Sequence, residues 1–430
     1  MNAEKDDRSG HTKGDETVFV DSSTGLRDVA VDTRQPRWVR VLRYTPLVLM
    51  VCLAVLATTV GVWYQQTHKP VTVPQSQSGA DSQSSATARV SSLPGVCAKQ
   101  VSQPDQGPWD ASDTFRTEAA FTSVTQGLGA WVEGKDHYLF WSDAVNANIS
   151  QAVGRVHVDE AQIQAWADYI TGIYHVAKEN GAQFLVMIAP AKWDVYRDKL
   201  PEWVDGLEGP TSRERLMAAH PELPWIDVRG ALVGERTADP DTPLYSRVNS
   251  HWTPYGASVA WARTLECLSA LDKTLTDLPG PDIESVLQEE APDEFAALGA
   301  TASCPQDWTV PVYAYDPGIV SVSYLQRNVS ATMQVSGGLD FADLPVTTTN
   351  PSAPDHTLLV ARDSMGNALS TGMMASFRQT IQVRNGFDVD QPTALEALVD
   401  LYRPDVVILE FAERYLAQTP GSGGTGADAG

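Results

Sequence analysis

Three continuous apolar runs, two of them preceded by helical stretches, constrain most strongly what this chain can fold into. The run "AQFLVMIAP" (182–190) follows an amphipathic stretch that ends at Gly181, which is the order helix, cap and strand. The runs "HTLLVARDS" (356–364) and "PDVVILEF" (404–411) are equally apolar, and the second also follows a helical stretch. Continuous apolar strands between helices are typical of a parallel sheet covered on both faces. The sequence therefore predicts an α/β domain, with "TIQVRNG" (380–386) as a weaker fourth strand.

The stretch 275–355 has a different character from the rest of this domain. It is rich in Pro, Thr and Ser and contains alternating pieces such as "VSVSYLQ" and "ATMQVS". Alternation over a few residues is typical of half-buried strands. We therefore expect loops and antiparallel hairpins here, inserted near a site at the carboxyl ends of the parallel strands.

A segment near the N-terminus has the length and composition of a membrane span. Thr45–Tyr64 is free of charged residues over 20 positions, enough to cross roughly 30 Å of hydrocarbon. Four arginines between positions 34 and 43 precede it, which places the N-terminus in the cytoplasm. The rival interpretation, a cleaved signal peptide, requires a start at the N-terminus and a small-residue cleavage site. Because a 44-residue tail comes first, we expect an uncleaved single-pass anchor in the plasma membrane.

The remaining segments complete the expected organisation. Residues 70–95 are rich in Ser, Gln and Pro, as in a flexible stalk. The expected order is a cytoplasmic disordered tail (1–44), a transmembrane helix (45–64), a stalk (65–96), an extracytoplasmic domain (97–418) and a disordered tail (419–430).

Charge and cysteine content narrow the choice of partners and ligands. The net charge is -23, and the residues up to Arg43 are neutral, so the negative charge lies beyond them. Such a surface argues against a nucleic-acid partner. Cys97, Cys267 and Cys304 would lie outside the membrane, where disulfides persist, and allow one bridge with one thiol left over. The sequence does not choose the pair, and no His/Cys cluster predicts a metal site.

The segment "NSHWTPYGA" (249–257) carries a candidate base. Asn249 and His251 are two residues apart, so both can face one side of an extended segment. A helix that opens at Thr253 would hold this loop rigidly. An amide can orient a catalytic imidazole by hydrogen bonding, as in Cys-His-Asn proteases. The simpler alternative is a structural loop with a packed Trp252.

The segment "LLVARDSMGNAL" (358–369) carries a candidate nucleophile. Ser364 follows a buried strand and precedes a Gly-containing helical stretch. The strand would fix the backbone, and the N–H of Ser364 itself would be available to an oxyanion. Alternatively, this serine only caps the next helix.

Together these segments resemble the alginate O-acetyltransferase (AlgX/AlgJ-like) family of the SGNH hydrolase-like superfamily. The loop that carries Asn249 and His251, called the base loop below, precedes Ser364 in the sequence. This order fits the permuted topology of that family. The resemblance implies an SGNH hydrolase-like three-layer α/β/α fold with a parallel sheet. Three further segments match it, namely "WVEGKDHYLFW" (131–141), "VMIAPAKWDVYRDKLPEW" (186–203) and "PDVVILEFAERYL" (404–416).

The resemblance also implies a mechanism. Ser364 would carry the acetyl group, His251 would act as base and then acid, and Asn249 would occupy the position of the orienting acid. A hydroxyl of an extracellular polysaccharide would be the acceptor. A multipass membrane-bound O-acyltransferase partner would export acetyl from cytoplasmic acetyl-CoA, because this chain has no nucleotide-binding signature. No cofactor of its own is expected.

The chain departs from the family at two positions. Asn249 replaces an Asp, for which Asp241 is an alternative orienter, and Arg362 replaces the Gly of "GDS". Arg362 would either supply positive charge near the oxyanion or be a surface residue at the strand end. Asp363 is expected to hold the nucleophile turn.

Five other residues are weaker candidates. Lys192 and Tyr196 follow a strand end and either line the site or are structural. Trp252 is expected to pack under His251 rather than to stack on a sugar. Glu413 and Arg414 are expected to form an ion pair at the sheet edge.

Two alternative functions remain open. A glycan O-acetyl esterase would differ only in the access of water to the acyl-enzyme. A catalytically silent glycan-binding or assembly protein of the envelope is motivated by Asn249 and Arg362.

Overall fold

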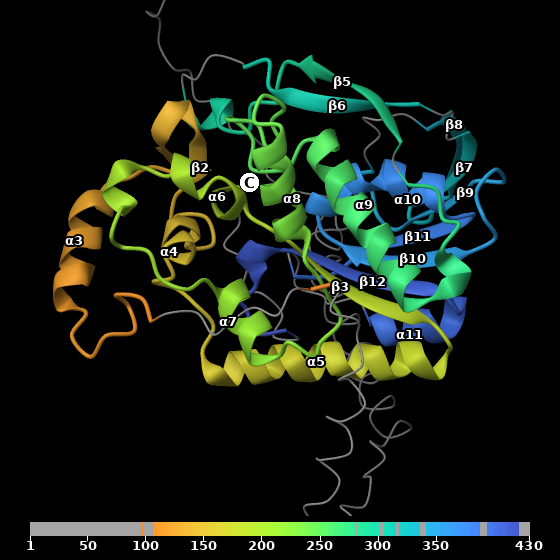
Figure 1. Ribbon diagram of the computed structural model, residues 1–430, viewed down its shortest axis with the longest axis horizontal. Helices are drawn as coiled ribbons and strands as arrows, with labels where there is room; N and C mark the ends of the chain where they lie inside the picture. The colour runs from red at the N-terminus through yellow and green to blue at the C-terminus, as the bar shows by residue number, and fades with distance from the viewer. Residues whose placement is uncertain are drawn as a thin grey trace, which may run out of the picture. The chain divides into compact units, whose positions relative to one another are not determined.

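The computed structural model (Figure 1) describes residues 97–98, 106–280, 282–300, 305–314, 318–335, 341–387 and 394–420. They all belong to one compact unit of the chain. The predicted cytoplasmic tail, transmembrane helix and stalk lie outside these residues, as does the predicted C-terminal tail beyond Pro420. Among the helices of the described ranges, none has the length and apolarity that crossing a membrane requires.

An eight-stranded sheet lies at the centre of the described residues. Its strand order is β4-β3-β12-β10-β11-β9-β7-β8. The first five strands run parallel to their neighbours, whereas β9, β7 and β8 are joined in antiparallel fashion. The strands are β3 (Gln183–Ala189), β4 (Trp225–Ile226), β7 (Ile319–Tyr324), β8 (Val329–Gln334), β9 (Val346–Thr349), β10 (Thr357–Arg362), β11 (Gln379–Arg384) and β12 (Val406–Ala412).

The sheet is therefore mixed, which corrects the prediction of a purely parallel one. All four apolar runs form parallel strands, β3, β10, β11 and β12, and their interiors are buried. The antiparallel part comes from the segment predicted to form hairpins. In β7, buried and exposed positions alternate at the start of the strand, as expected for a strand with one covered face. The hairpins thus extend the main sheet instead of forming only a separate insertion.

Helices cover both faces of the sheet and complete three layers (Figure 1). Helices α5 (Glu160–Glu179) and α11 (Leu395–Tyr402) lie on one face, and α8 (Val228–Ala238), α9 (Pro254–Leu271) and α10 (Ser370–Ser376) on the other. Helix α5 begins at a capping box and is followed by Gly181 with φ of 81°, a backbone conformation that favours glycine. The predicted helix, cap and strand order is confirmed here.

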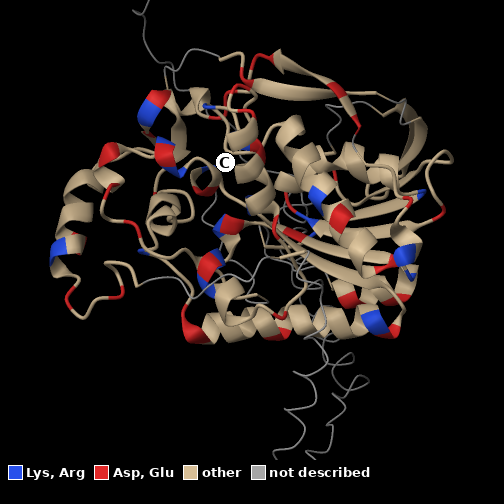
Figure 2. Cartoon of the chain, in the orientation of Figure 1, with Lys and Arg blue, Asp and Glu red and all other residues tan. Residues whose placement is uncertain are grey.

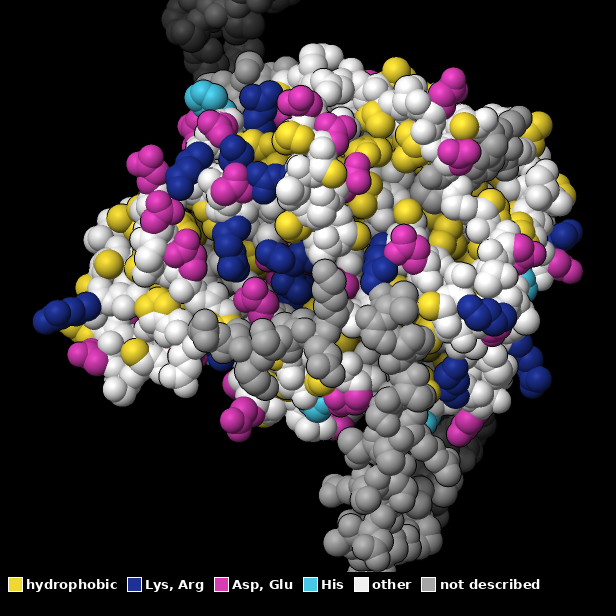
Figure 3. All heavy atoms as spheres, in the orientation of Figure 1, with side chains coloured by type: hydrophobic (Ala, Val, Ile, Leu, Met, Phe, Trp, Pro, Cys, Tyr) yellow, Lys and Arg dark blue, Asp and Glu magenta, His cyan; other side chains and the backbone are white. Residues whose placement is uncertain are grey.

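Shorter elements surround this core. Strands β1 and β2 form an antiparallel pair within the segment 131–141, and β5 and β6 form a separate hairpin. Figure 2 shows charged residues mostly on the helices and loops around the sheet, and both signs are interspersed on the face seen in Figure 3. The elements are α3 (Phe115–Thr125), α4 (Asn148–Ala152), α6 (Lys192–Val195), α7 (Ser212–Ala219), β1 (Trp131–Glu133), β2 (Leu139–Trp141), β5 (Ile283–Glu289), β6 (Trp308–Tyr313) and the 3-10 helices η1 (Lys135–His137), η2 (Arg197–Lys199), η3 (Glu202–Val204), η4 (Lys273–Leu275), η5 (Ala296–Leu298), η6 (Met365–Leu369) and η7 (Glu413–Tyr415).

Two cysteines meet in the core. Cys97 and Cys267 of α9 are buried, and their thiols are in hydrogen-bonding contact. This contact lowers the pKa of Cys97, and the positive charge of the nearby Arg263 guanidinium lowers it further. Cys304 lies outside the described residues.

Candidate active site

The site lies where the carboxyl ends of three adjacent strands meet. Ser364 follows β10, Arg414 follows β12, and Lys192 follows β3. Because these strands are parallel neighbours in the sheet, their ends lie at one edge. The loop that carries His251 reaches this edge from the start of α9.

Ser364, His251 and Asn249 form a continuous chain of hydrogen bonds. The Oγ of Ser364 lies 2.9 Å from Nε2 of His251, and Nδ1 of His251 lies 3.2 Å from Oδ1 of Asn249. The serine and the histidine come from segments more than one hundred residues apart in sequence, and both side chains are partly exposed. The structure therefore brings together the three residues that the sequence predicted as nucleophile, base and orienter.

The amide of Asn249 has a fixed orientation. Its Nδ2 donates to the carbonyl of Pro292 at 2.9 Å, so its oxygen faces the imidazole. That oxygen also accepts the backbone N–H of His251 at 2.9 Å. An acceptor beside Nδ1 favours the tautomer with the proton on that nitrogen. Nε2 is then free to accept the hydroxyl proton of Ser364.

The imidazole is held in its neutral form. Burial lowers the pKa of His251 to about 4. The carboxylate of Glu294 opposes this shift, and the positive charges of Arg414 and Lys192 reinforce it. A neutral imidazole is the form that a general base requires.

Asp363 holds the nucleophile turn through backbone hydrogen bonds. Its Oδ1 accepts the N–H of Met365 at 2.8 Å, and its Oδ2 accepts the N–H of Ala412 at 2.7 Å. These bonds join β10 to the end of β12. Within the described residues no acceptor is found for the backbone N–H of Ser364, which leaves this donor for a ligand.

Trp252 packs inside the protein, as the sequence predicts, and is 1% exposed. Its Nε1 donates to the carbonyl of Met365 at 2.7 Å. The residue after the base is thus joined to the residue after the nucleophile. Helix α9 holds the loop further, because Thr253 caps it and the close approach of Gly256 to the carbonyl of Leu244 leaves no space for a Cβ.

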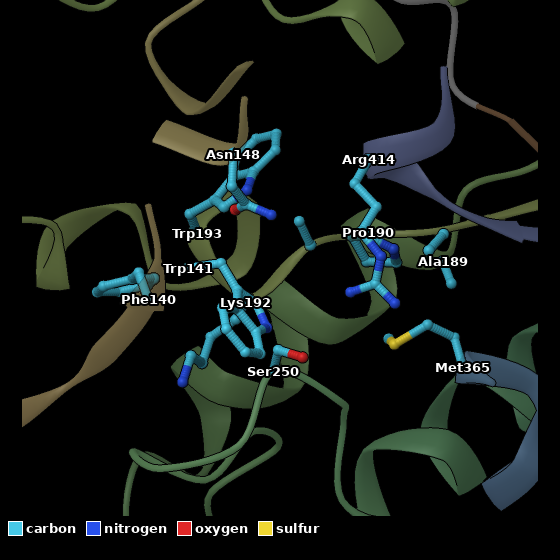
Figure 4. A pocket seen from close by; sticks show the side chains of 12 residues that line it. Phe140, Trp141, Asn148, Ala189, Pro190, Lys192, Trp193, Ser250, Met365 and Arg414 are labelled. Carbon is cyan, nitrogen blue, oxygen red and sulfur yellow. The ribbon is translucent and has the colours of Figure 1, made fainter. Parts of the chain in front are cut away.

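A pocket that is partly open to solvent is lined by Met365, the residue after Ser364 (Figure 4). Its wall is largely apolar and includes the aromatic side chains of Phe140, Trp141 and Trp193. The guanidinium of Arg414 points into it. The indole N–H of Trp193 is buried and has no hydrogen-bond partner among the described residues. The lining residues are Phe140, Trp141, Asn148, Ala189, Pro190, Ala191, Lys192, Trp193, Ser250, Met365, Ala412 and Arg414.

Lys192 lines the pocket but is 3% exposed. Its Nζ donates to the carbonyls of Ser246 and Arg247 at 3.1 and 3.0 Å, at the start of the base loop. The ring of Phe140 lies 5.3 Å from the same nitrogen. Burial lowers the pKa of Lys192 to about 7, against the opposing charges of Glu294 and Asp307.

Arg362 points into the core and not toward the oxyanion position or the surface. Its side chain is fully buried and donates to Gln382, Asn367 and two backbone carbonyls. It lies against Gly366, where a Cβ would come within 2.4 Å of Cδ of Arg362. Beside it, burial raises the pKa of Glu410 well above its usual range. Arg362 therefore neither supplies charge near the oxyanion nor lies at the surface, as the sequence suggested. It joins parts of the core to one another.

Tyr196 and Asp241 also lie away from the pocket lining. Tyr196 is 4% exposed, and its hydroxyl accepts the N–H of Leu244 at 3.0 Å. It therefore stabilises the segment that leads into the base loop. Asp241 is exposed, and its carbonyl accepts from Gln288. The structure does not bring its carboxylate to His251, which removes it as the alternative orienter.

Glu413 and Arg414 do not form the expected ion pair. Glu413 lies 3.6 Å from Arg213 and accepts the backbone N–H of Ala191. Burial and Asp194 raise the pKa of Glu413 to about 8. Arg414 faces the pocket instead, because the residues of η7 after β12 alternate between the core and the site.

Sequence reasoning missed two carboxylates that hold the base loop. Asp307 accepts from Ser246 Oγ at 2.6 Å and from the N–H of Arg247 at 2.9 Å. Glu294 binds Ser250, between Asn249 and His251. Both lie on the connection between β5 and β6, which has no regular hydrophobic period to place it. Within the described ranges, no group of three or more His, Cys, Asp or Glu residues could hold a metal ion.

Comparison with known proteins supports the resemblance stated from the sequence. Residues 131–317 match a family described as SGNH hydrolase-like domain, acetyltransferase AlgX. This stretch of the chain is therefore similar to the AlgX-type SGNH hydrolase-like domain. The AlgX match includes Asn249 and His251 and ends before Ser364. None of the curated proteins matches this chain in sequence.

Several solved structures are similar in fold to this chain. PatB1 of Bacillus cereus, with a sulfonyl adduct, is 13% identical with a TM-score of 0.48, covering 67% of this chain and 96% of that one. The O-acetyltransferase domain of AlgJ from Pseudomonas putida is 18% identical with a TM-score of 0.38, covering 68% and 93%. AlgX of Pseudomonas aeruginosa is 14% identical with a TM-score of 0.36, covering 67% and 63%.

Proposed function

We propose that this protein is an extracytoplasmic O-acetyltransferase that moves acetyl groups to hydroxyls of a polysaccharide through an acetyl-Ser364 intermediate. The 2.9 Å contact between Ser364 Oγ and His251 Nε2, with Asn249 on the other ring nitrogen, carries this proposal. Nucleophile, base and orienter in this arrangement recur in acyl transfer on unrelated folds. The match to an acetyltransferase domain supports the choice of acyl group.

The proton path follows from the tautomer that Asn249 favours. Ser364 Oγ attacks the acetyl carbonyl of the donor, Nε2 of His251 takes the hydroxyl proton, and the leaving group departs with that proton. In the second half, Nε2 takes the proton of the acceptor hydroxyl, whose oxygen attacks the acetyl carbon. The bond from the carbon to Oγ breaks, and His251 returns the proton to Ser364.

Negative charge on the tetrahedral oxygen would be met by two groups. The unpaired backbone N–H of Ser364 is one donor. The guanidinium of Arg414, which points into the pocket, is the second (Figure 4). Donors fixed before the reaction stabilise developing charge without reorganisation.

A sugar unit of the acceptor would lie at the open side of the pocket next to Ser364. Trp141, which lines the pocket and is partly exposed, offers flat apolar surface to such a sugar. A sugar in this pocket would displace water from the acyl-enzyme, which favours transfer over hydrolysis.

The source of acetyl and the cellular location belong to the same proposal. The uncharged segment Thr45–Tyr64 and the arginines before it favour a single-pass anchor in the plasma membrane, with the domain outside. A donor derived from cytoplasmic acetyl-CoA then has to cross the membrane. A multipass acyltransferase partner would deliver it.

The test is made in the producing cell with the full chain. Ser364→Ala replaces the gene's own codon, and base-labile acetate is measured on purified surface polysaccharides. Ser258→Ala, at a buried serine of α9 that bonds only its own helix, is the matched control. Loss of acetate in Ser364→Ala alone, at unchanged protein level, is the expected result. Unchanged acetate overturns the proposal, and increased acetate identifies an esterase.

A further inference from the structure

The base loop carries a neutral amide where a carboxylate would be the stronger partner. An amide oxygen orients the imidazole, but it does not stabilise the imidazolium that forms when Ser364 is deprotonated as a carboxylate does. Arg414 and Lys192 both act against that positive charge. A site with Asn249 alone would therefore raise the barrier to proton transfer.

A second segment brings a carboxylate to the same loop. Glu294 accepts the backbone N–H of Ser250 at 2.5 Å through Oε2 and the Ser250 hydroxyl at 2.8 Å through Oε1. Ser250 is the residue between Asn249 and His251. The N–H of Glu294 in turn donates to the carbonyl of Val248 at 3.1 Å. The backbone and the side chain of Glu294 thus both bind the base loop.

The carboxylate of Glu294 accepts a further hydrogen bond. The indole N–H of Trp141 donates to Oε1 at 3.1 Å. Phe295 is fully buried with its ring 4.8 Å from that of Trp141. Asp293 accepts the N–H groups of Phe295 and Ala296 and fixes the turn. This is a built position for a carboxylate, because three donors bind it, one of them the indole N–H of Trp141.

We propose that two residues divide the work of the orienting acid: Asn249 fixes the tautomer of His251, and Glu294 supplies the negative charge that stabilises its protonated form. Glu294 is a positioning residue, since it acts through the base and does not reach the reacting atoms. The inference rests on the proposed acyl-transfer function. It also explains how a chain with Asn249 can retain a working base.

Three charged groups shift the pKa of the His251 imidazole. Glu294 comes from the connection between β5 and β6, Arg414 from the end of β12, and Lys192 from the start of α6. Glu294 is the acidic group among these three, so its removal leaves two positive charges beside the imidazole. The charge balance at His251 is therefore most sensitive to this residue.

The kinetic test uses the full-length protein in detergent and an activated acetyl ester. Glu294→Gln keeps the shape and one acceptor for Ser250 but removes the charge. We expect acetylation of Ser364 to slow by at least about tenfold, which corresponds to one pKa unit of lost imidazolium stabilisation. Asn249→Asp in the Glu294→Gln background restores a carboxylate at the family position and should recover most of the rate. Glu290→Gln, at an exposed residue of the same connection, is the control and leaves the rate unchanged.

A second measurement does not depend on turnover. The pKa of His251, followed by NMR of histidine-labelled protein, falls in Glu294→Gln and rises in Asn249→Asp if the charge assignment is correct. An unchanged pKa and an unchanged acetylation rate in Glu294→Gln overturn the inference. If the wild type is never acetylated but the pKa shifts occur, the charge pairing stands and the proposed function fails.

Discussion

The indole N–H of Trp252 donates a 2.7 Å hydrogen bond to the carbonyl of Met365, and this bond joins the base loop directly to the nucleophile turn. Each partner is the immediate neighbour of a reacting residue, His251 on one side and Ser364 on the other. The distance between the serine and the imidazole is thus set by a buried contact that does not take part in proton transfer.

Trp252→Phe tests that relationship. The ring stays, but the carbonyl of Met365 loses its donor, which should cost about 1–3 kcal/mol of stability. Acetylation of Ser364 should also slow by about tenfold or more because the base shifts. Trp261→Phe is the control, because the indole N–H of Trp261 donates to the hydroxyl of Ser376 at a distance of 3.0 Å. This hydrogen bond lies away from the site. Equal acetylation rates in the two variants would show that the contact is not a positioning one.

The pKa of His251 predicts the pH dependence of stability. Burial lowers it from 6.5 to about 4, so the unfolded chain binds the proton more tightly than the folded one. Stability should therefore be lost as the pH falls from about 6.5 to about 4, by no more than roughly 3 kcal/mol from this group. Urea unfolding of the wild type and His251→Gln across this window measures it, and parallel curves would contradict the prediction.

The same pKa predicts the acid limb of the reaction. The free enzyme should keep kcat/KM for an activated acetyl ester down to a midpoint near pH 4 instead of near 6.5. The measurement is a pH profile of kcat/KM at constant ionic strength. A midpoint close to the usual value for histidine would mean that the imidazole is more hydrated than its burial implies.

Arg362→Gly restores the glycine of the family motif but should not improve the protein. The buried guanidinium makes its bonds within the core, and its removal takes this donor from Asn367 and leaves Gln382 Oε1 with the Ser370 hydroxyl. We expect a loss of about 3–5 kcal/mol in urea unfolding, as when one partner of a buried charged network is removed. Arg384→Gly, on the neighbouring strand at an exposed position, should cost less. Similar losses in the two variants would refute the assignment.

With the domain outside the cytoplasm, as proposed above, Cys97 and Cys267 are expected to form a disulfide. Their thiols are already in contact in the core, and oxidation by a disulfide such as oxidised glutathione links them while two glutathione thiols are released. Non-reducing peptide mapping of the full chain should find this link, with Cys304 left open to alkylation. Cys267→Ser should lower stability by about 2–5 kcal/mol, and Cys304→Ser should not. A link that contains Cys304 would contradict the pairing.

Sequence patterns predicted the strands and the central pair of the site for a clear physical reason. Buried strands are continuous apolar runs. Ser364 and His251 lie in short segments whose local patterns each allowed a structural alternative, and the resemblance to a family joined them into one site. Glu294 could not be found in this way, because its role depends on a contact with Ser250 that only the folded chain creates. Arg362 was misplaced because a strand-end arginine is usually exposed, whereas here Gly366 leaves space for it inside the protein.

The position of β12 between β3 and β10 has a consequence for how the protein is made. Of the described strands, β12 is the last to be synthesised and is the third of the five parallel ones, so the facing edges of β3 and β10 have no partner strand until then. The hydrogen bond from the N–H of Ala412 to Asp363 forms only after Ala412 has been synthesised, and the pocket wall is complete only after Arg414 has been added. A chain halted before these residues has the nucleophile and the base but no assembled site. The proposed acyl transfer therefore requires that synthesis has passed Arg414.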